Sequence, residues 1–307
     1  MGQFKEIKAV DNFYQASLFF PMPTIAITTL SESGKTNIGS YSLCFPYYIA
    51  GKDYYAMILE VRSSSNTAQN ILRTGKCALN FITDDRKAFK ELVRLGFPGK
   101  TTDEKMKDCI FDLQKGEAEG EGRPLVLSDA YQIIECTWDD TLEDAFKDKE
   151  KIGQLEGVDG PYHNFNGITS KYGCHFILKI DKILMKEKYA DAIKNGVKRN
   201  SFPKVPVDYG YRDSKNFWYT RFKAKPIAEP IAGSNAMSVE SVVFCAERLD
   251  TDVKFTKEAC AQLVRIPRVF LKAALMDIVG YCDRHGIKEV TPDVLKANMA
   301  EKKGKKF

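Results

Sequence analysis

The sequence predicts an α+β fold, in which a mainly antiparallel β-barrel is followed by a small helical domain. Between residues 23 and 83, short β-branched and apolar segments follow one another closely and are separated by turns that contain glycine. After a stretch rich in Pro, Ala, Gly and Ser, apolar residues recur at helical spacing. We therefore expect a barrel domain at residues 1–222, a linker at 223–250, and a helical domain with a basic tail at 251–307.

The strands of the barrel can be assigned in chain order. The turn Ser31–Lys35 contains Gly34, which can adopt positive φ, and so separates two strands. A short helix is expected before the fourth strand, and helix and loop are expected over the charged residues 84–122. The expected strands are 24–30, 37–44, 54–61, 77–82, 133–138 and 174–180.

Three helices are expected near the C-terminal end of the sequence. Thr256 can cap a helix from Lys257 to about Arg265, and Pro267 interrupts it. The second helix ends at Gly286, and Thr291-Pro292 begins the third in the preferred capping arrangement. Apolar residues occur at helical spacing in the second helix, at Phe270, Ala273, Ala274, Ile278 and Tyr281.

Composition and charge limit the possible functions. The 307 residues are 44% hydrophobic and 28% charged, as in soluble globular proteins. The net charge of +5 is too small to indicate nucleic-acid binding, and the tail Lys302–Lys306 supplies four of these charges. No apolar run approaches the ~20 residues needed to span a bilayer, and the first residues lack the apolar core of a signal peptide. We expect a cytoplasmic protein that binds neither membranes nor nucleic acids.

The cysteines and histidines do not form a recognisable metal or disulfide pattern. None of the eight cysteines forms a CxxC pair, and several lie in apolar segments, so we expect buried thiols in a reducing compartment. No two of the three histidines have the spacing of metal ligands, and no metal site is expected. The sequence also lacks the G-x-S-x-G and G-x-x-x-x-G-K-[ST] motifs, which argues against hydrolase and P-loop chemistry.

The segment EVRSSSNTAQNI, residues 60–71, places an arginine, three serines, an asparagine and a threonine at the end of an expected strand. Ser64 or Ser65 could cap a helix that runs through Ala68 to Leu72. Alternatively, the hydroxyls, the arginine and the free N–H groups of a helix N-terminus could hold a phosphate dianion. The two interpretations are compatible, and the residues alone do not separate them.

Several short motifs, taken in order, resemble the flavin reductase-like, FMN-binding split-barrel family over about residues 10–222. The motifs are Pro23–Thr29, Thr36–Ser42, Ser63–Ile71 and Thr74–Asn80, with later similarities at Gly173–Ile177, Tyr209–Arg212 and Phe217–Tyr219. The resemblance implies an FMN-binding split β-barrel that forms homodimers. The sequence departs from the family at Ile180, where the family often has glycine, and this bears on how closely a nicotinamide can approach.

The resemblance also implies which residues bind the cofactor. The FMN phosphate would be surrounded by Arg62, Ser63, Ser64, Ser65 and Thr67, and the isoalloxazine ring would lie beside Asn37, Ser40, Tyr41 and Ser42. His175 is a candidate for orienting a hydride donor near the flavin, or else a core histidine. His163 lies in a loop and reaches either the flavin or only solvent.

The resemblance implies an NAD(P)H:flavin oxidoreductase that passes electrons from NADH, NADPH or a reduced protein through bound FMN. One alternative is a non-enzymatic electron carrier of the flavoredoxin type, which works with a protein partner. Another alternative is a barrel that has lost its flavin, but the intact turn from Arg62 to Thr67 argues against this.

About residues 252–298 resemble the C-terminal helical domain of the light-independent protochlorophyllide reductase B subunit. The similarity lies in Phe255–Ala259, Leu263–Lys272 and Val290–Val294. It does not imply reduction of protochlorophyllide, because the sequence lacks cysteine spacing for an iron–sulfur cluster. The domain is either a helical addition that packs on the barrel or a docking module for a redox partner.

Overall fold

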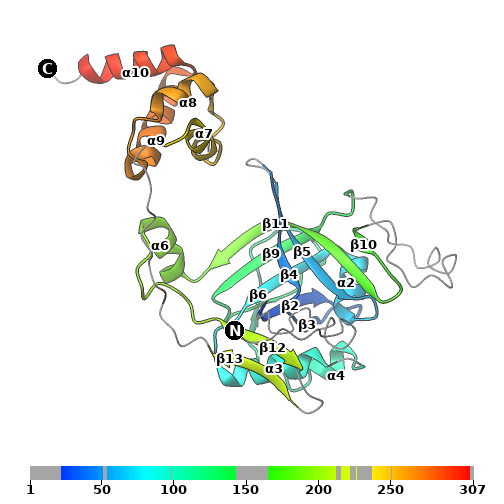
Figure 1. The fold of residues 1–307 in the computed structure, drawn as a ribbon. Helices are drawn as coiled ribbons and strands as arrows, with labels where there is room; N and C mark the ends of the chain where they lie inside the picture. Colours follow the sequence, from blue (N-terminus) through cyan, green and yellow to red (C-terminus); the bar gives the residue numbers. More distant parts are fainter. Residues whose placement is uncertain are drawn as a thin grey trace, which may run out of the picture. The chain divides into compact units, whose positions relative to one another are not determined.

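The computed structural model describes residues 22–50, 54–97, 99–142, 165–211, 216–221, 226, 237–249 and 251–304. The chain divides into two compact units, one containing the large β-sheet and one containing the C-terminal helices (Figure 1). Each unit has its own hydrophobic core. Among the described residues, no helix combines the length and apolar character needed to cross a membrane.

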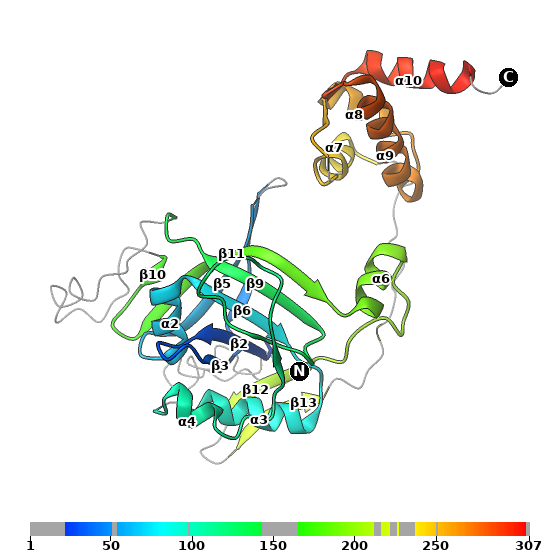
Figure 2. The same ribbon diagram turned by 180° about the vertical axis from the view of Figure 1, so that it is seen from behind.

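The first unit is built on an eight-stranded sheet with the order β3-β2-β6-β9-β11-β5-β4, and β10 pairs with β11 at one side. The pairs β2–β3, β2–β6, β6–β9, β9–β11 and β5–β11 are all antiparallel. The sheet curls around its own inner face, as Figures 1 and 2 show from opposite sides. Its strands are β2 Ile25–Leu30, β3 Thr36–Tyr41, β4 Cys44–Ala50, β5 Tyr54–Arg62, β6 Lys76–Phe81, β9 Gln132–Trp138, β10 Gly167–Ile168 and β11 Gly173–Met185.

The inner face of the curled sheet forms the main core. Alternate residues of each strand point inward, because side chains in a strand change face at every residue. Ile27, Leu59, Leu79 and Phe176 are fully buried there, and the rings of Phe176 and Trp138 pack edge to face at 5.1 Å. The β-branched and apolar segments of the sequence therefore form the sheet and its core, as predicted.

The outer face of the sheet near β2 and β3 is covered by α3 (Arg86–Gly96). Phe89, Leu92 and Leu95 are buried in this second layer, together with Ala26 of β2. A small three-stranded sheet, in which β12 lies between β1 and β13, packs on α3 through Phe217 and Tyr219 of β13, whose rings contact Phe89. The remaining elements of the unit are β1 Met22–Pro23, α2 Asn66–Thr74, α4 Thr102–Met106, β7 Leu113–Gln114, β8 Val126–Leu127, α6 Glu187–Asn195, β12 Pro206–Tyr211 and β13 Phe217–Arg221.

The second unit consists of helices around one core. The predicted boundaries are confirmed: Thr256 caps α8, Pro267 precedes α9, and Gly286 ends α9 with a φ of 66°. A short parallel pair, β14 with β15, joins the segments before α8 and α10. The elements are α7 Val239–Glu247, β14 Lys254–Phe255, α8 Lys257–Leu263, α9 Arg268–His285, β15 Glu289–Val290 and α10 Pro292–Gly304.

The structure differs from the sequence-based expectation in two features of this unit. Residues 239–247 belong to the predicted linker but form α7, and Val242 and Ala246 of α7 are buried in the helical core. Of the apolar residues that predicted α9, Ile278 and Tyr281 are buried, whereas Phe270 and Ala273 are exposed. Helical spacing identified the helix but did not identify the side that faces the core.

Candidate functional site

The hydroxyl-rich segment forms a tight turn between β5 and α2. Ser65 is the N-cap of α2, and its side-chain oxygen accepts a hydrogen bond of 3.1 Å from the N–H of Ala68. The N–H of Ser65 donates to the carbonyl of Arg62 at 3.0 Å, which closes the turn. The capping interpretation of this segment is therefore confirmed, with Ser65 as the cap.

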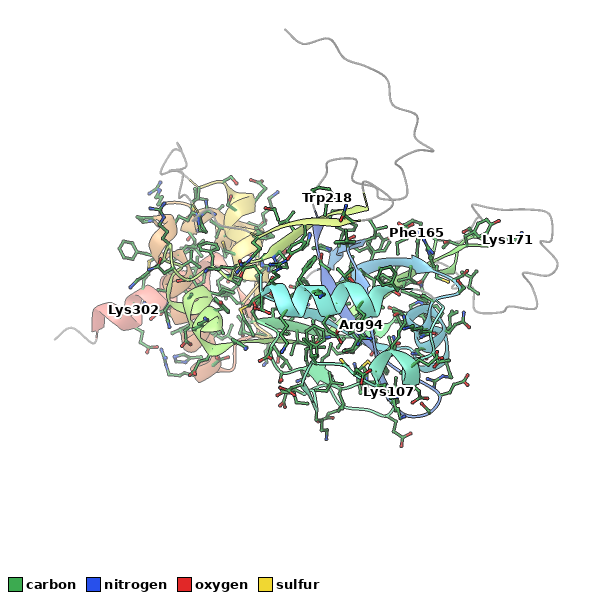
Figure 3. All side chains as sticks on the ribbon, turned by 90° about the horizontal axis from the view of Figure 1, so that it is seen from below. Arg94, Lys107, Phe165, Lys171, Trp218 and Lys302 are labelled. Carbon is green, nitrogen blue, oxygen red and sulfur yellow. The ribbon has the colours of Figure 1, made fainter. Side chains whose placement is uncertain are left out.

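Hydrogen bonds join the turn to the loop that leads into β11. The N–H of Ser63 donates to the carbonyl of Tyr172 at 2.9 Å, and its hydroxyl donates to the carbonyl of Lys171 at 3.0 Å. Gln69 of α2 donates from its side-chain amide to the carbonyl of Ser63 at 2.6 Å. These three bonds fix the backbone of the turn, so its outward-facing groups have defined positions. Lys171 is labelled in Figure 3.

The end of β3 lies against the same turn. The hydroxyl of Tyr41 is hydrogen-bonded to the side chains of Ser65 and Thr67, and Arg62 is close enough to influence it electrostatically. Burial raises the pKa of Tyr41 above its ordinary value of 10.0, while these hydrogen bonds and the charge of Arg62 act in the opposite direction. The structure thus brings Tyr41 together with three of the five residues predicted to hold a phosphate.

Gly39 permits this close approach. A Cβ atom at position 39 would lie 2.6 Å from Cε2 of Tyr41 and 2.7 Å from Oγ1 of Thr67. Both distances are shorter than real Cβ contacts allow, so a larger residue would have to displace the tyrosine ring or the threonine. The close packing of Tyr41 and Thr67 therefore requires a residue without a side chain at position 39.

The side chain of Asn37 is buried and makes hydrogen bonds to other side chains of the protein. Its side chain is 1% exposed, and its Oδ1 accepts hydrogen bonds from Asn66 at 3.5 Å and from Thr102 at 3.3 Å. Its amide group donates to Thr29 at 3.5 Å. This network links β3, α2 and α4 beneath the turn. Sequence reasoning missed Asn66 and Thr102, because only the fold brings these separate segments together.

The other predicted residues lie nearer the surface. Ser40 and Ser42 are partly buried, and the Cβ of Ser40 would be 3.0 Å from a Cβ added at Gly96 of α3. Arg62 and Ser64 are exposed. A surface pocket of about 570 Å³ lies beside α2 and is lined mainly by polar residues of the β2–β3 turn, α2 and the start of α4, including Asn66 and Gln69; Arg62, Ser63, Ser64 and Ser65 are not among the lining residues.

His175 lies on β11, in register with Glu60 of β5, and Gly173 is in register with Arg62. Because residues two apart in a strand share a face, His175 and Arg62 lie on the same face of the sheet, about 7 Å apart along the strand direction. Cys174 points to the other face and is buried in the core. His175 is only partly buried.

The ring of His175 contacts an aromatic neighbour. It packs edge to face on Phe165 at 5.1 Å, and Phe165 lies 6.1 Å from the ring of Tyr47 on β4. Phe165 is labelled in Figure 3. The Nδ1 atom of His175 is buried and has no hydrogen-bond partner. Among the described residues, no other buried side-chain nitrogen or oxygen atom lacks a partner. His163 lies outside the described residues.

The chemistry of the turn suits an anion. Hydroxyl groups, a guanidinium and the N–H groups at the start of α2 are all donors, and the first turn of α2 contains no acidic residue. Within the described ranges, no three His, Cys, Asp or Glu side chains are grouped as metal ligands would be. The side chains of Cys44, Cys77, Cys136 and Cys174 are buried in the core of the barrel.

No protein-family model matches this sequence, and no curated protein matches it. The structure is similar to that of Pseudomonas fluorescens 2-nitrobenzoate 2-nitroreductase NbaA, at 16% identity, with a TM-score of 0.50, over 75% of this chain and 96% of that chain. It is equally similar to flavoredoxin from Methanosarcina acetivorans, at 13% identity and a TM-score of 0.50, over 76% and 98% of the two chains. These similarities confirm the predicted α+β fold, a mainly antiparallel split barrel.

Proposed function

We propose that this protein is an FMN-dependent oxidoreductase of the flavin reductase type, which passes electrons from NADH, NADPH or a reduced protein through bound FMN. The observation that carries the proposal is the turn between β5 and α2, with Arg62, Ser65 and Thr67 gathered around the hydroxyl of Tyr41. The split-barrel fold supports it, because the fold and the turn point to the same class of ligand.

Arg62, Ser63, Ser64, Ser65 and Thr67 would hold the FMN phosphate. Arg62 and Ser64 are exposed at the surface of the turn, where a bound anion would meet them. Ser63 and Ser65 are held by the hydrogen bonds of the turn and would mainly fix the backbone N–H groups in place. An arginine supplies charge-assisted hydrogen bonds, which are stronger than those between neutral groups.

Asn37, Ser40, Tyr41 and Ser42 would lie beside the isoalloxazine ring. Ser40 and Ser42 are small and leave room, while Asn37 would act indirectly, because its side chain holds β3 to α2 and α4. The unpartnered Nδ1 of His175 is a candidate polar contact for a flavin or a hydride donor. Bound FMN would supply the hydride- and electron-transfer chemistry, and these residues would bind and orient it.

A non-enzymatic FMN carrier is the second candidate function. Ile180 occupies the position at which the family often has glycine, and its side chain packs against the main core cluster. The replacement of glycine by a branched residue there bears on how closely a nicotinamide can approach. The predicted homodimer, the cytoplasmic location and the redox role of the helical domain also stay predictions.

Titration of the purified full-length protein with FMN and with riboflavin tests the proposal, using the quenching of flavin fluorescence. The two ligands differ only in the phosphate. We expect FMN to bind at least about tenfold more tightly, since one or two charge-assisted hydrogen bonds are worth 1.4 kcal/mol or more. Equal affinities, or no binding of either flavin, would overturn the phosphate assignment.

A further inference from the structure

Helix α9 exposes apolar side chains on the side that faces away from its core. Leu271, Leu275 and Ile278 are buried among the other helices of the unit. Within the first half of the helix, however, Phe270 is 62% exposed, Met276 is 47% exposed, and Ala273 between them is exposed as well. A group of large apolar side chains left outside a core is a common mark of a contact surface.

Three cationic residues lie close to these side chains in the sequence. Arg265, Arg268 and Lys272 are exposed, and none of them makes an ion pair with any residue that the structure describes. The nearest acid along the helix face, Asp277, is already paired with Lys302 of α10. We call six residues the α9 patch: Arg265, Arg268, Phe270, Lys272, Ala273 and Met276.

The start of α9 adds to the positive potential. Its N-cap is Pro267, which makes no side-chain hydrogen bond to the helix, and the first turn contains no acidic residue. The partial positive charge of the helix N-terminus is therefore not offset, although acids are favoured at this position. Figure 1 shows α9 with α7, α8 and α10 in this unit.

We propose that the α9 patch docks an acidic protein and, resting on the function proposed above, that this partner is a small electron carrier. The composition favours a protein, because exposed Phe and Met with Arg at the margin are enriched in protein–protein interfaces. Charge complementarity selects an acidic partner, and it would increase the rate of association through long-range attraction.

Binding of two acidic carriers in their oxidised states, a [2Fe–2S] ferredoxin and a flavodoxin, tests the proposal. The full-length protein is immobilised without added flavin, so a failure of flavin binding is measured separately and does not affect the result. We expect one carrier to bind at low ionic strength and to bind at least about tenfold more weakly at 0.2 M salt, where surface charges are screened.

A matched pair of charge reversals locates the contact. The test variant is Arg268→Glu/Lys272→Glu, and the control is Lys254→Glu/Lys288→Glu. Lys254 donates its N–H to the carbonyl of Lys288 beside the C-terminal end of α9, and the helix has 18 residues, about 27 Å. Both variants change the net charge equally. We expect a loss of at least about tenfold in affinity for the test variant and less than about twofold for the control.

Phe270→Ser tests the apolar part, and circular dichroism checks that each variant is folded. This variant should also bind more weakly but should keep the salt dependence of the wild type. Equal losses in the two charge reversals, or no binding of either carrier, would overturn the proposal. Binding of phosphatidylserine vesicles or of a single-stranded oligonucleotide more tightly than either carrier, with loss in the same test variant, would show that the surface serves polyanions and would overturn it too.

Discussion

The double variant Arg62→Ala/Ser64→Ala should weaken FMN binding while leaving the fold intact. Both side chains are exposed, so their removal opens no cavity in the core. The N-cap bond from Ser65 to Ala68 is unchanged. A hydrogen bond to a charged group contributes about 1.5–3 kcal/mol, and a typical one about 0.5–1.5 kcal/mol. Because both groups are in contact with water, we take the lower limit of each range. The double variant should therefore lose about 2 kcal/mol of binding free energy, which is about a 30-fold rise in the Kd for FMN.

The assay is a fluorescence titration of wild type and variant with FMN and with riboflavin at one ionic strength. Riboflavin affinity should be unchanged, because the ligand lacks the phosphate. Arg86→Ala, which removes the same charge from the exposed start of α3, is the control for net charge and should leave both affinities unchanged. The reasoning is refuted if the Kd for FMN changes by less than about threefold in the folded double variant, since that corresponds to under 1 kcal/mol.

Three further predictions concern individual residues of the barrel. Gly39→Ala should lower the free energy of unfolding by about 1–3 kcal/mol, because its Cβ would overlap Tyr41 and Thr67; an unchanged urea midpoint would contradict this. Because burial raises the pKa of Tyr41, the unfolded chain releases this proton at lower pH than the folded one, so stability should fall as pH rises above 10.0; Tyr41→Phe should remove this part of the decline, and equal declines in both proteins would argue against it. Burial also raises the pKa values of Cys44 and Cys136, so a thiol reagent should label them only after unfolding in urea; rapid labelling in the native protein would contradict their burial.

The features that were predictable from the sequence have local causes. Ser65, Thr256 and Gly286 mark helix ends, because a cap depends on a few neighbouring residues. The strands were predictable because β-branched and apolar residues cluster between turn residues. The hydroxyl-rich turn could be located for the same reason, and its resemblance to a known family gave a specific ligand hypothesis.

The features that were missed depend on contacts between distant segments. Helix α7 follows a Pro-, Gly- and Ser-rich stretch, and Val242 and Ala246 become core residues only when the other helices pack on them. Phe270 fits a helical spacing as well as Ile278 does, but only the three-dimensional arrangement shows which is buried. The contact of Tyr41 with the turn likewise requires β3 to lie against α2.

The most direct test of the central claim is the visible absorption spectrum of the purified protein, after incubation with FMN and removal of unbound flavin. The spectrum is then repeated without oxygen after addition of NADH and then NADPH. We predict a flavin band that elutes with the protein and is bleached by one of the two nucleotides; a band that persists would identify the carrier function. Absence of a band after incubation with FMN would contradict the account, because the turn from Arg62 to Thr67 would then be only a helix cap.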